Sequence, residues 1–169
     1  MGEYQHISHT FQPVYNEQSK ILILGSFPSV KSREEGFYYG HPRNRFWQVM
    51  ASICDCPVPQ TIEEKKKMLL TNRYAIWDVI DSCDIIGSSD SSIRNVVPAD
   101  IASLVAKTQI TKIILNGQTA GKLYRKRIEP NLATAIEVQI LPSTSPANAA
   151  SSLDVLIKVW SEALDLRES

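Results

Sequence analysis

Lys20-Ile-Leu-Ile-Leu-Gly25, followed by Ser26-Phe-Pro-Ser29, is the clearest indication of fold class in this chain. The short, unbroken apolar run is typical of a strand that is buried on both faces of a parallel sheet. The turn after it leads the chain away from the sheet. Because open α/β sheets bind ligands beyond the carboxyl ends of their strands, we expect the functional site to begin at this turn.

Three further apolar segments resemble this strand: Arg73–Asp78, Thr111–Asn116 and Ile136–Pro142. Segments with helical periodicity alternate with them, which favours a parallel sheet with right-handed crossovers. We therefore predict a single α/β domain over residues 1–169, a three-layer α/β/α sandwich with a central four-stranded, mainly parallel sheet. The predicted helices are Arg43–Ile53, Thr61–Leu70, Ile101–Lys107, Gln118–Ile128 and Asn148–Leu166.

Local signals refine this outline. The second predicted helix begins with a Thr-x-x-Glu capping box at Thr61. Gly2–Tyr15 shows no clear periodicity, and we expect it to pack along the edge of the sheet. Asp81–Asp90 is rich in serine and aspartate and contains Gly87, so we expect a polar surface loop there.

The composition is that of an ordinary soluble globular protein, with 43% hydrophobic and 21% charged residues. The formal net charge is zero, which counts mildly against a nucleic-acid partner but is compatible with a local basic rim. Three cysteines, Cys54, Cys56 and Cys83, are too few for a closed disulfide framework or a four-thiolate cluster. The first residues do not begin a signal peptide and no apolar run approaches membrane length, so we expect a cytoplasmic protein without membrane association.

The stretch Phe37-Tyr-Tyr-Gly-His-Pro-Arg-Asn-Arg-Phe-Trp47 crowds aromatic, basic and amide side chains into one short segment. Gly36 and Gly40 flank its aromatic run, which favours a loop over the interior of a helix or strand. Aromatic faces suit a planar base, arginines suit phosphate, and an amide can orient a water or recognise a base edge. The stretch therefore predicts a pocket for an extrahelical nucleobase.

Gly25-Ser-Phe-Pro-Ser29 followed by His41-Pro-Arg-Asn-Arg-Phe-Trp47 resembles the uracil-DNA glycosylase superfamily. A second segment, Leu141-Pro-Ser-Thr-Ser-Pro-Ala-Asn148, stands where that superfamily has its second motif, after the last strand. The similarity is strongest to the branch that includes the mismatch-specific uracil and the hypoxanthine-DNA glycosylases. The His-Pro-x-Asn-Arg-Phe-Trp string is specific, and the two motifs together span nearly the whole chain.

The resemblance implies a monofunctional DNA glycosylase that flips a deaminated base out of DNA and hydrolyses its N-glycosyl bond in base excision repair. We expect hypoxanthine as the substrate first, with uracil and xanthine as further candidates. No lysine suited to Schiff-base chemistry is evident, so water is the expected nucleophile. We expect no metal or organic cofactor, no obligate protein partner, and a monomer that acts on DNA containing a deaminated base.

Two other functions stay open at this point. One is a non-catalytic α/β domain that binds damaged DNA or nucleotides. The other is a small esterase that uses Ser26 or Ser29, although the chain has no Gly-x-Ser-x-Gly motif.

Phe27 stands where many relatives place an asparagine or aspartate that activates water. Phenylalanine forms no hydrogen bond with its side chain, so an active enzyme needs another residue for this role. The hypoxanthine branch also lacks the first-motif asparagine, and the asparagine of the His-Pro-x-Asn-Arg-Phe string is implicated in catalysis there. Asn44 is that residue here, and its amide can accept and donate hydrogen bonds. Local sequence alone favours another role for Asn44, as N-cap of the helix that contains Phe46.

The resemblance also implies that the base stacks on Tyr39 and that the backbone amides after the first strand hold its negative charge as it departs. That segment alone is equally compatible with an ordinary strand-to-helix turn. His41 precedes a proline, and we expect it to fix the loop or to contact the base or a phosphate. The expected base-binding residues are Gly25, Ser26, Phe27, Pro28, Ser29, Tyr39, His41 and Asn116.

Hydroxyl and N–H groups at the start of a helix are good phosphate ligands, and the second motif precedes the last predicted helix. The same residues would also serve as a plain capping loop. Arg45 is expected either to contact phosphate or to pair internally, and Asp78 to be a structural residue first and a catalytic candidate second. The expected DNA-binding residues are Arg43, Ser143, Thr144, Ser145 and Asn148.

Two remaining features favour ordinary roles. His6 and His9 have i, i+3 spacing, but no acidic or cysteine residue lies nearby in the sequence to complete a metal site. The basic residues within 122–127 are interpreted as the solvated face of a helix.

Overall fold

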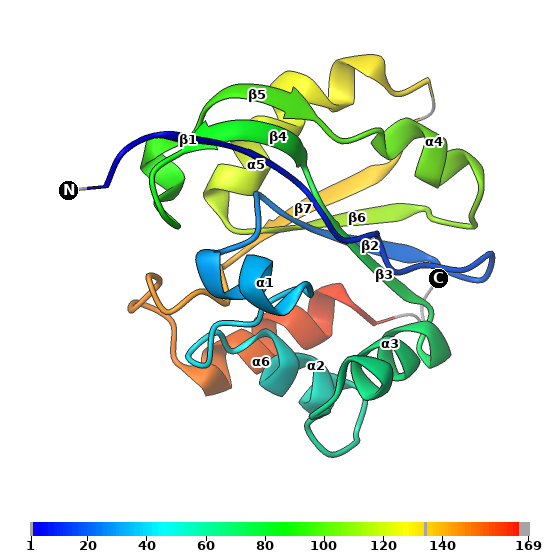
Figure 1. Ribbon diagram of the computed structural model, residues 1–169. Coiled ribbons are helices and arrows are strands. Elements are labelled where there is room, and N and C mark those ends of the chain that lie inside the picture. The colour runs from blue at the N-terminus through cyan, green and yellow to red at the C-terminus, as the bar shows by residue number, and fades with distance from the viewer. Residues whose placement is uncertain (1, 134, 166–169) are drawn as a thin grey trace.

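The computed structural model describes residues 2–133 and 135–165 and has a parallel sheet at its centre (Figure 1). The strand order in this sheet is β3-β2-β6-β7, and all three pairings are parallel. Every strand predicted from an apolar run is present and is one residue shorter than predicted at one or both ends. The strands are β2 (Ile21–Gly25), β3 (Tyr74–Asp78), β6 (Lys112–Asn116) and β7 (Glu137–Leu141).

Helices cover both faces of the parallel sheet, which confirms the predicted layers (Figure 1). Ile21 and Ile23 of β2 belong to the core on one face, and Leu22 and Leu24 belong to the core on the other. This division follows from the two-residue period of a strand, and it explains why β2 is apolar at every position. The first face carries α1 (Val30–Glu35), α2 (Phe46–Ile53), α3 (Ile62–Thr71) and α6 (Leu153–Ala163), and the second carries α4 (Ile101–Ala106) and α5 (Gln118–Arg127).

All five predicted helices are present, with some shifted ends, and the short helix α1 was not predicted. The capping box at the start of α3 is confirmed, because the Thr61 hydroxyl accepts from the Glu64 N–H and the Glu64 carboxylate accepts from the Thr61 N–H. Helix α6 begins at Leu153 rather than at Asn148, since the Ser152 hydroxyl caps it there. The predicted end of this helix, Leu166, lies outside the described residues.

A second, antiparallel sheet in the order β1-β4-β5 was not predicted. Its middle strand continues almost directly from β3, so the expectation of a surface loop over Asp81–Asp90 is wrong as far as Ile85. The polar residues of this strand indicated a loop, but in the structure they form hydrogen bonds with the neighbouring strands. Asp84 accepts from His6 at 2.9 Å and from Asn95 at 2.8 Å. The strands are β1 (Gln5–Ser8), β4 (Ile80–Ile85) and β5 (Arg94–Pro98).

The expectation that the N-terminal segment packs along the edge of the sheet is confirmed only near Val14, because residues 5–8 form β1 of the antiparallel sheet. Val14 and Ile76 exchange backbone hydrogen bonds of 3.0 Å in an isolated antiparallel bridge. Two single turns of 3-10 helix, Asp90–Ser92 and Glu129–Asn131, complete the described elements. Within residues 2–133 and 135–165, no helix has the length and apolar character needed to cross a membrane.

Candidate active site

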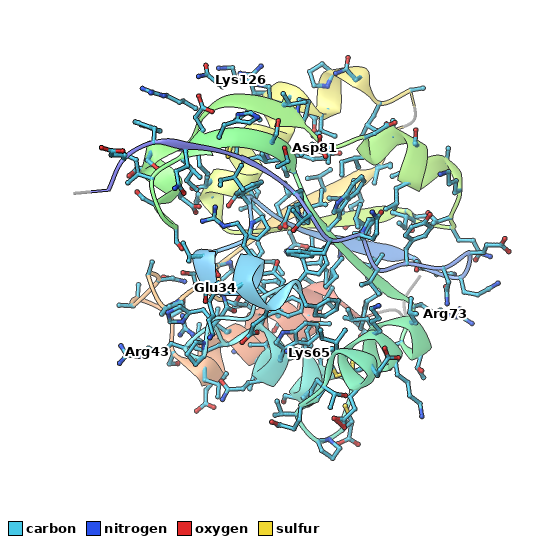
Figure 2. The ribbon with its side chains drawn as sticks, viewed as in Figure 1. Glu34, Arg43, Lys65, Arg73, Asp81 and Lys126 are labelled. Atoms are coloured by element: carbon cyan, nitrogen blue, oxygen red, sulfur yellow. The ribbon has the colours of Figure 1, made fainter. Side chains whose placement is uncertain are left out.

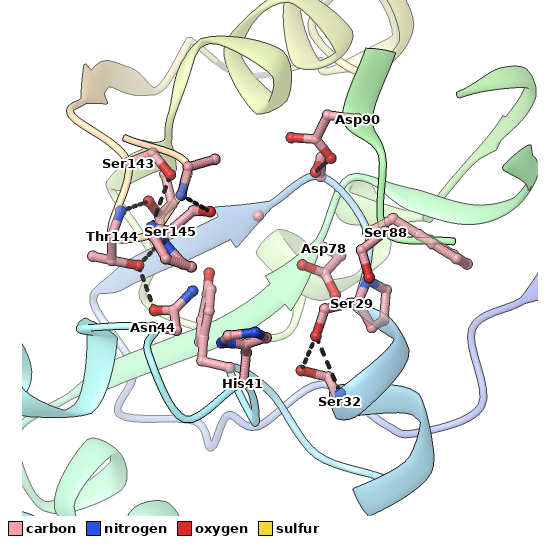
Figure 3. A pocket seen from close by; sticks show the side chains of 18 of the residues that line it. Ser29, Ser32, His41, Asn44, Asp78, Ser88, Asp90, Ser143, Thr144 and Ser145 are labelled. Carbon is pink, nitrogen blue, oxygen red and sulfur yellow. Dashed lines mark hydrogen bonds between the residues drawn. The ribbon is translucent and has the colours of Figure 1, made fainter. Parts of the chain in front are cut away.

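A cavity of about 480 Å³ opens at the carboxyl ends of the parallel strands (Figure 3). The last residues of three neighbouring strands, Asp78 of β3, Gly25 of β2 and Asn116 of β6, line it and form its floor. Loops form its walls, at residues 26–29, 38–44, 88–91 and 143–147. All eight predicted base-binding residues line the cavity, as do Asn44, Ser143, Thr144 and Ser145, whereas Arg43 and Asn148 lie outside its lining.

Gly25 is buried at the middle of the floor, where two side chains approach its backbone closely. A Cβ atom at this position would lie 2.7 Å from Asp78 Oδ1 and 3.1 Å from Tyr39 Oη. Contacts below 3.0 Å do not occur for real Cβ atoms, so any larger residue would displace one of these groups. Glycine is therefore required here by close approach, as its place after a buried strand suggested.

Asp78 forms a buried pair with His9, in which His9 Nε2 lies 2.8 Å from Asp78 Oδ2. The side chains are only 3% and 5% exposed, respectively. The pair joins residues 69 positions apart, so the acidic partner of His9 is supplied by folding and not by local sequence. Asp78 thus has both a structural partner and a place in the cavity lining.

Tyr39 lies beside the floor with one face of its ring covered. Its ring stacks on that of Phe46, with centroids 4.1 Å apart and planes 20° from parallel. Its hydroxyl is buried without a hydrogen-bond partner among the described residues. Burial and the negative charge of Asp78 raise the pKa of Tyr39, while Asn116 acts in the opposite direction. The ring stays a phenol at neutral pH, and Tyr39 is one of the residues that line the cavity.

Asn44 uses its amide oxygen within the protein. Asn44 Oδ1 accepts from the Phe46 N–H at 2.9 Å and from the Thr144 hydroxyl at 2.9 Å, which occupies both lone pairs. Because a backbone N–H must meet an oxygen, the amide is oriented with Nδ2 directed into the cavity (Figure 3). The capping role and the pocket role that the sequence left open are thus combined in one side chain, although the structural N-cap of α2 is Arg45.

Thr144 is fully buried and links the two amides of the site. Its hydroxyl donates to Asn44 and accepts from Asn116 Nδ2 at 3.1 Å, and its N–H donates to Asn116 Oδ1 at 3.0 Å. The structure therefore corrects the expected DNA contact of the Thr144 side chain, whose polar groups are all used to position Asn44 and Asn116. This internal bridge connects loops from opposite ends of the chain.

Arg45 holds the second-motif loop in place by donating to its backbone carbonyl groups. The guanidinium donates to Ser145 O at 2.9 Å, to Asn148 O at 3.0 Å and to Ser151 O. Of the two roles expected for this arginine, the internal one is present. Asn148 is used in the same loop, because its Nδ2 donates to Ser143 O at 3.0 Å.

Hydroxyls at the rim also have internal partners. Ser143 Oγ accepts from the Ser145 N–H, and Ser145 Oγ accepts from the Ala147 N–H, both at 3.1 Å. Ser29 is the N-cap of α1 and accepts from Ser32 N–H. Ser26 donates to Asp90 at 3.2 Å. In the described part of the chain neither Ser26 nor Ser29 is hydrogen-bonded to a histidine, which removes the geometric basis for a serine esterase.

His41 and Arg43 form the exposed end of the first-motif loop. His41 Nδ1 accepts from the Arg43 N–H at 3.1 Å, which is the loop-fixing role expected for this histidine. The Arg43 side chain is exposed and extends from the side of the molecule where the strands of the parallel sheet end (Figure 2). Phe27 is half-buried at the wall, with its ring 6.1 Å from that of His9.

Sequence reasoning missed His9 and the segment 88–91 as parts of the site. Asp90, in this segment, bonds Ser26, and burial with the nearby charge of Asp78 raises the pKa of Asp90. Ser88 Oγ accepts from the Val30 N–H at 2.8 Å, so the segment is tied to the start of α1. No local signal marks these residues, because their contribution depends on how the antiparallel sheet packs beside β2.

The described residues contain no group of three or more histidine, cysteine, aspartate or glutamate side chains suited to a metal ion. His6 and His9 each pair with a different aspartate, Asp84 and Asp78. All three cysteines are free thiols.

Comparison with known proteins agrees with this geometry. Residues 12–164 match the model of the uracil DNA glycosylase superfamily. The chain is 37% identical over 147 residues to a hypoxanthine DNA glycosylase of Methanosarcina acetivorans, covering 84% of this chain and 89% of that protein. It is 34% identical over 157 residues to a hypoxanthine DNA glycosylase of Methanosarcina barkeri, covering 90% of this chain and 95% of that protein.

A solved structure shares the fold. It is the solution NMR structure of a Methanosarcina acetivorans protein studied as a candidate uracil DNA glycosylase, with a TM-score of 0.78 and 32% sequence identity. The match covers 91% of this chain and 94% of that one. The family match and the two relatives named as DNA glycosylases identify this cavity, which both motif loops line, as that of a DNA glycosylase. The chain belongs to the uracil DNA glycosylase superfamily.

Proposed function

We propose that this enzyme excises hypoxanthine from DNA by hydrolysis, with uracil and xanthine as secondary substrates, as a step in base excision repair. The observation that supports this most directly is the inward amide of Asn44 above a floor that ends in Asp78, Gly25 and Asn116. The names of the two Methanosarcina relatives support the same substrate.

In the proposed reaction the C1′–N9 bond of the flipped nucleotide breaks and its electron pair leaves with the base. The Nδ2–H of Asn44 donates to an oxygen or nitrogen of the base and stabilises that charge, together with backbone N–H groups of residues 25–29 other than Pro28. The base lies against the free face of the Tyr39 ring. Water then adds to C1′ and loses a proton, which leaves an abasic site.

Water is the proposed nucleophile because none of the described residues that line the cavity is a lysine. Without an amine near C1′, no covalent Schiff-base intermediate can form, so strand cleavage should not accompany base release. The proposed DNA contacts are the exposed side chain of Arg43 and, at the rim of the cavity, the loop of residues 143–148 apart from the buried Thr144 side chain.

The first test is single-turnover excision from matched duplexes that contain hypoxanthine, uracil or xanthine, with alkali-sensitive sites as the readout. We expect wild type to release hypoxanthine fastest. Asn44→Ala should slow release by at least about 100-fold, the usual effect of removing one donor to a developing anion. Gln48→Ala is the matched control, because Gln48 is an exposed amide on the helix that follows and should be replaceable without effect.

Three outcomes would have different meanings. Full activity in Asn44→Ala would contradict the role of Asn44 but leave the substrate proposal intact. Release of another base in preference to hypoxanthine would overturn the substrate proposal. Lesion-selective binding without release of any base would favour the non-catalytic alternative.

A further inference from the structure

The carboxylate of Asp78 is the deepest charged group of the cavity. Asp78 is only 4% exposed and ends β3 at the floor. A flipped nucleotide enters such a cavity base first, and its sugar stays with the DNA at the mouth. The Watson–Crick edge of the base lies opposite the glycosidic bond, so this edge meets the floor. Asp78 is therefore placed to contact the base, and it lies far from the mouth where water must reach C1′.

His9 fixes the orientation of the Asp78 carboxylate. Only one ring nitrogen of His9 has a partner: Nε2 contacts Asp78 Oδ2, while Nδ1 is buried and has no hydrogen-bond partner among the described residues. A proton on Nδ1 would be a buried, unpaired donor, which is costly. The neutral tautomer with hydrogen on Nε2 avoids this cost. His9 therefore donates to Asp78 Oδ2 and holds the carboxylate in place.

The other carboxylate oxygen is left for a ligand. Asp78 Oδ1 accepts no hydrogen bond from any residue between 2 and 133 or 135 and 165, and it lies on the side of Gly25 and Tyr39. Because Asp78 lines the cavity and Oδ1 has no donor among the residues described, this oxygen can accept a hydrogen bond from a ligand in the cavity. The group that would pair with it is a donor, and Figure 3 shows the carboxylate at the floor of the cavity, across from Asn44.

Deamination creates a donor at the required place. Adenine has a lone pair at N1 beside an amino group, whereas hypoxanthine has an N1–H beside a carbonyl oxygen. Uracil differs from cytosine in the same sense at N3. A fixed carboxylate accepts from the new N–H and repels the lone pair of the undamaged base.

We propose that Asp78, oriented by His9, accepts the N–H that deamination creates on the Watson–Crick edge, and so selects hypoxanthine against adenine. This inference rests on the proposed function. Guanine also has an N1–H and a neighbouring carbonyl oxygen, so its exclusion requires another feature of the cavity. His9 is a positioning residue in this scheme, because it acts through Asp78 and does not line the cavity.

The test is a binding measurement that does not depend on catalysis. Duplexes carry 2′-fluoro-2′-deoxyinosine or 2′-fluoro-2′-deoxyadenosine, because a 2′-fluorine destabilises positive charge at C1′ and prevents hydrolysis. Wild type should bind the inosine duplex at least about 100-fold more tightly, because adenosine cannot form the hydrogen bond that the site provides through Asp78. In Asp78→Asn, His9 holds the amide oxygen and turns the NH₂ group to the cavity. This variant should lose nearly all of the preference, by inosine binding more weakly and adenosine more tightly.

The control is Asp81→Asn, which changes an exposed aspartate three positions away and should leave the preference unchanged (Figure 2). His9→Ala should lower the preference as well, and His9→Gln, which keeps a donor, should restore part of it. An undiminished preference in folded Asp78→Asn would overturn the proposal. Folding of each variant is checked by thermal unfolding.

A second measurement applies if Asp78→Asn does not fold. N1-methylhypoxanthine lacks the N–H and is larger at the same position, so wild type should reject it. Asp78→Ala should bind its duplex about as well as the hypoxanthine duplex, because the smaller side chain leaves room. Equal rejection by both proteins would show that N1 does not face Asp78. Absence of hypoxanthine release by wild type would instead contradict the proposed function, so the two failures are distinguishable.

Discussion

Gly25 and Asp78 illustrate how single residues shape the site. Gly25 has no side chain because a Cβ atom would press on Asp78 Oδ1 at 2.7 Å, and the phenol of Tyr39 is close behind at 3.1 Å. Neither neighbour can move freely: Asp78 is paired with His9, and the Tyr39 ring is stacked on Phe46. The arrangement of the cavity floor therefore requires that residue 25 has no Cβ atom.

Gly25→Ala should lower the single-turnover rate of base release by at least about 10-fold. The added methyl group displaces the side chains at the floor of the cavity, and a shift of about 1 Å is enough to slow the reaction. Gly36→Ala is the opposite case. Gly36 has φ +74 and nothing within 4 Å of an added Cβ, so this variant should lose about 1 kcal/mol of stability and keep its rate. The pair is compared by rate and by urea unfolding; equal rates in the two variants would contradict the argument.

At the scale of elements, the start of α2 and the loop before α6 form one unit. Arg45, at the N-cap of α2, donates to four carbonyl groups of that loop, and Thr144 bridges from the loop to Asn44 and Asn116. The guanidinium is suited to this because its N–H donors point in fixed, diverging directions. The two motifs are thus structurally dependent on each other.

Arg45→Lys should loosen this loop, because an ammonium group, with three donors at one point, cannot satisfy four separated carbonyl oxygens. We expect base release to slow by about 10-fold or more, with faster amide hydrogen exchange over residues 143–151. Arg127→Lys, an exposed arginine in the last turn of α5, is the matched control and should change neither quantity. Unchanged exchange in Arg45→Lys would argue against the clamp.

At the scale of the whole molecule, DNA binding cannot depend on bulk charge, since the formal net charge is zero. The cavity mouth and the exposed Arg43 lie on the side where the parallel strands end, so attraction to phosphate is local (Figure 2). A small number of phosphate contacts implies a weak dependence of affinity on salt. Specificity then depends mainly on the cavity.

Arg43→Ala should weaken binding to damaged and undamaged duplexes by the same factor and reduce the slope of log K against log salt concentration by about 1. The expected change follows from the loss of one phosphate contact. Arg127→Ala, on the face of the sheet covered by α5, should leave the slope unchanged. A loss of lesion preference in Arg43→Ala, with an unchanged slope, would show that this arginine contacts the base and not the backbone.

The parallel sheet and its covering helices were predictable because their signals are short-range. Four apolar runs predict the four strands, although the edge strand β7 is only partly buried, and the Thr61 capping box marks the start of α3. The motif residues could also be named, since the turn after β2 and the stretch before α2 are contiguous in the sequence. The antiparallel sheet could not be predicted in the same way, because the polar residues of β4 have partners on β1 and β5 that local sequence does not indicate.

Chemical roles within the site depended on tertiary structure. Asn44 and Thr144 are 100 positions apart, and His9 and Asp78 are 69 apart. Only packing brings these groups within hydrogen-bonding distance, and only then does Asn44 turn its nitrogen inward and Thr144 become a buried bridge. The sequence alone determines which aromatic, amide and carboxylate residues are available to the site. Which atom of each faces the base follows from the fold, because a hydrogen bond is directional and its partner must first be placed.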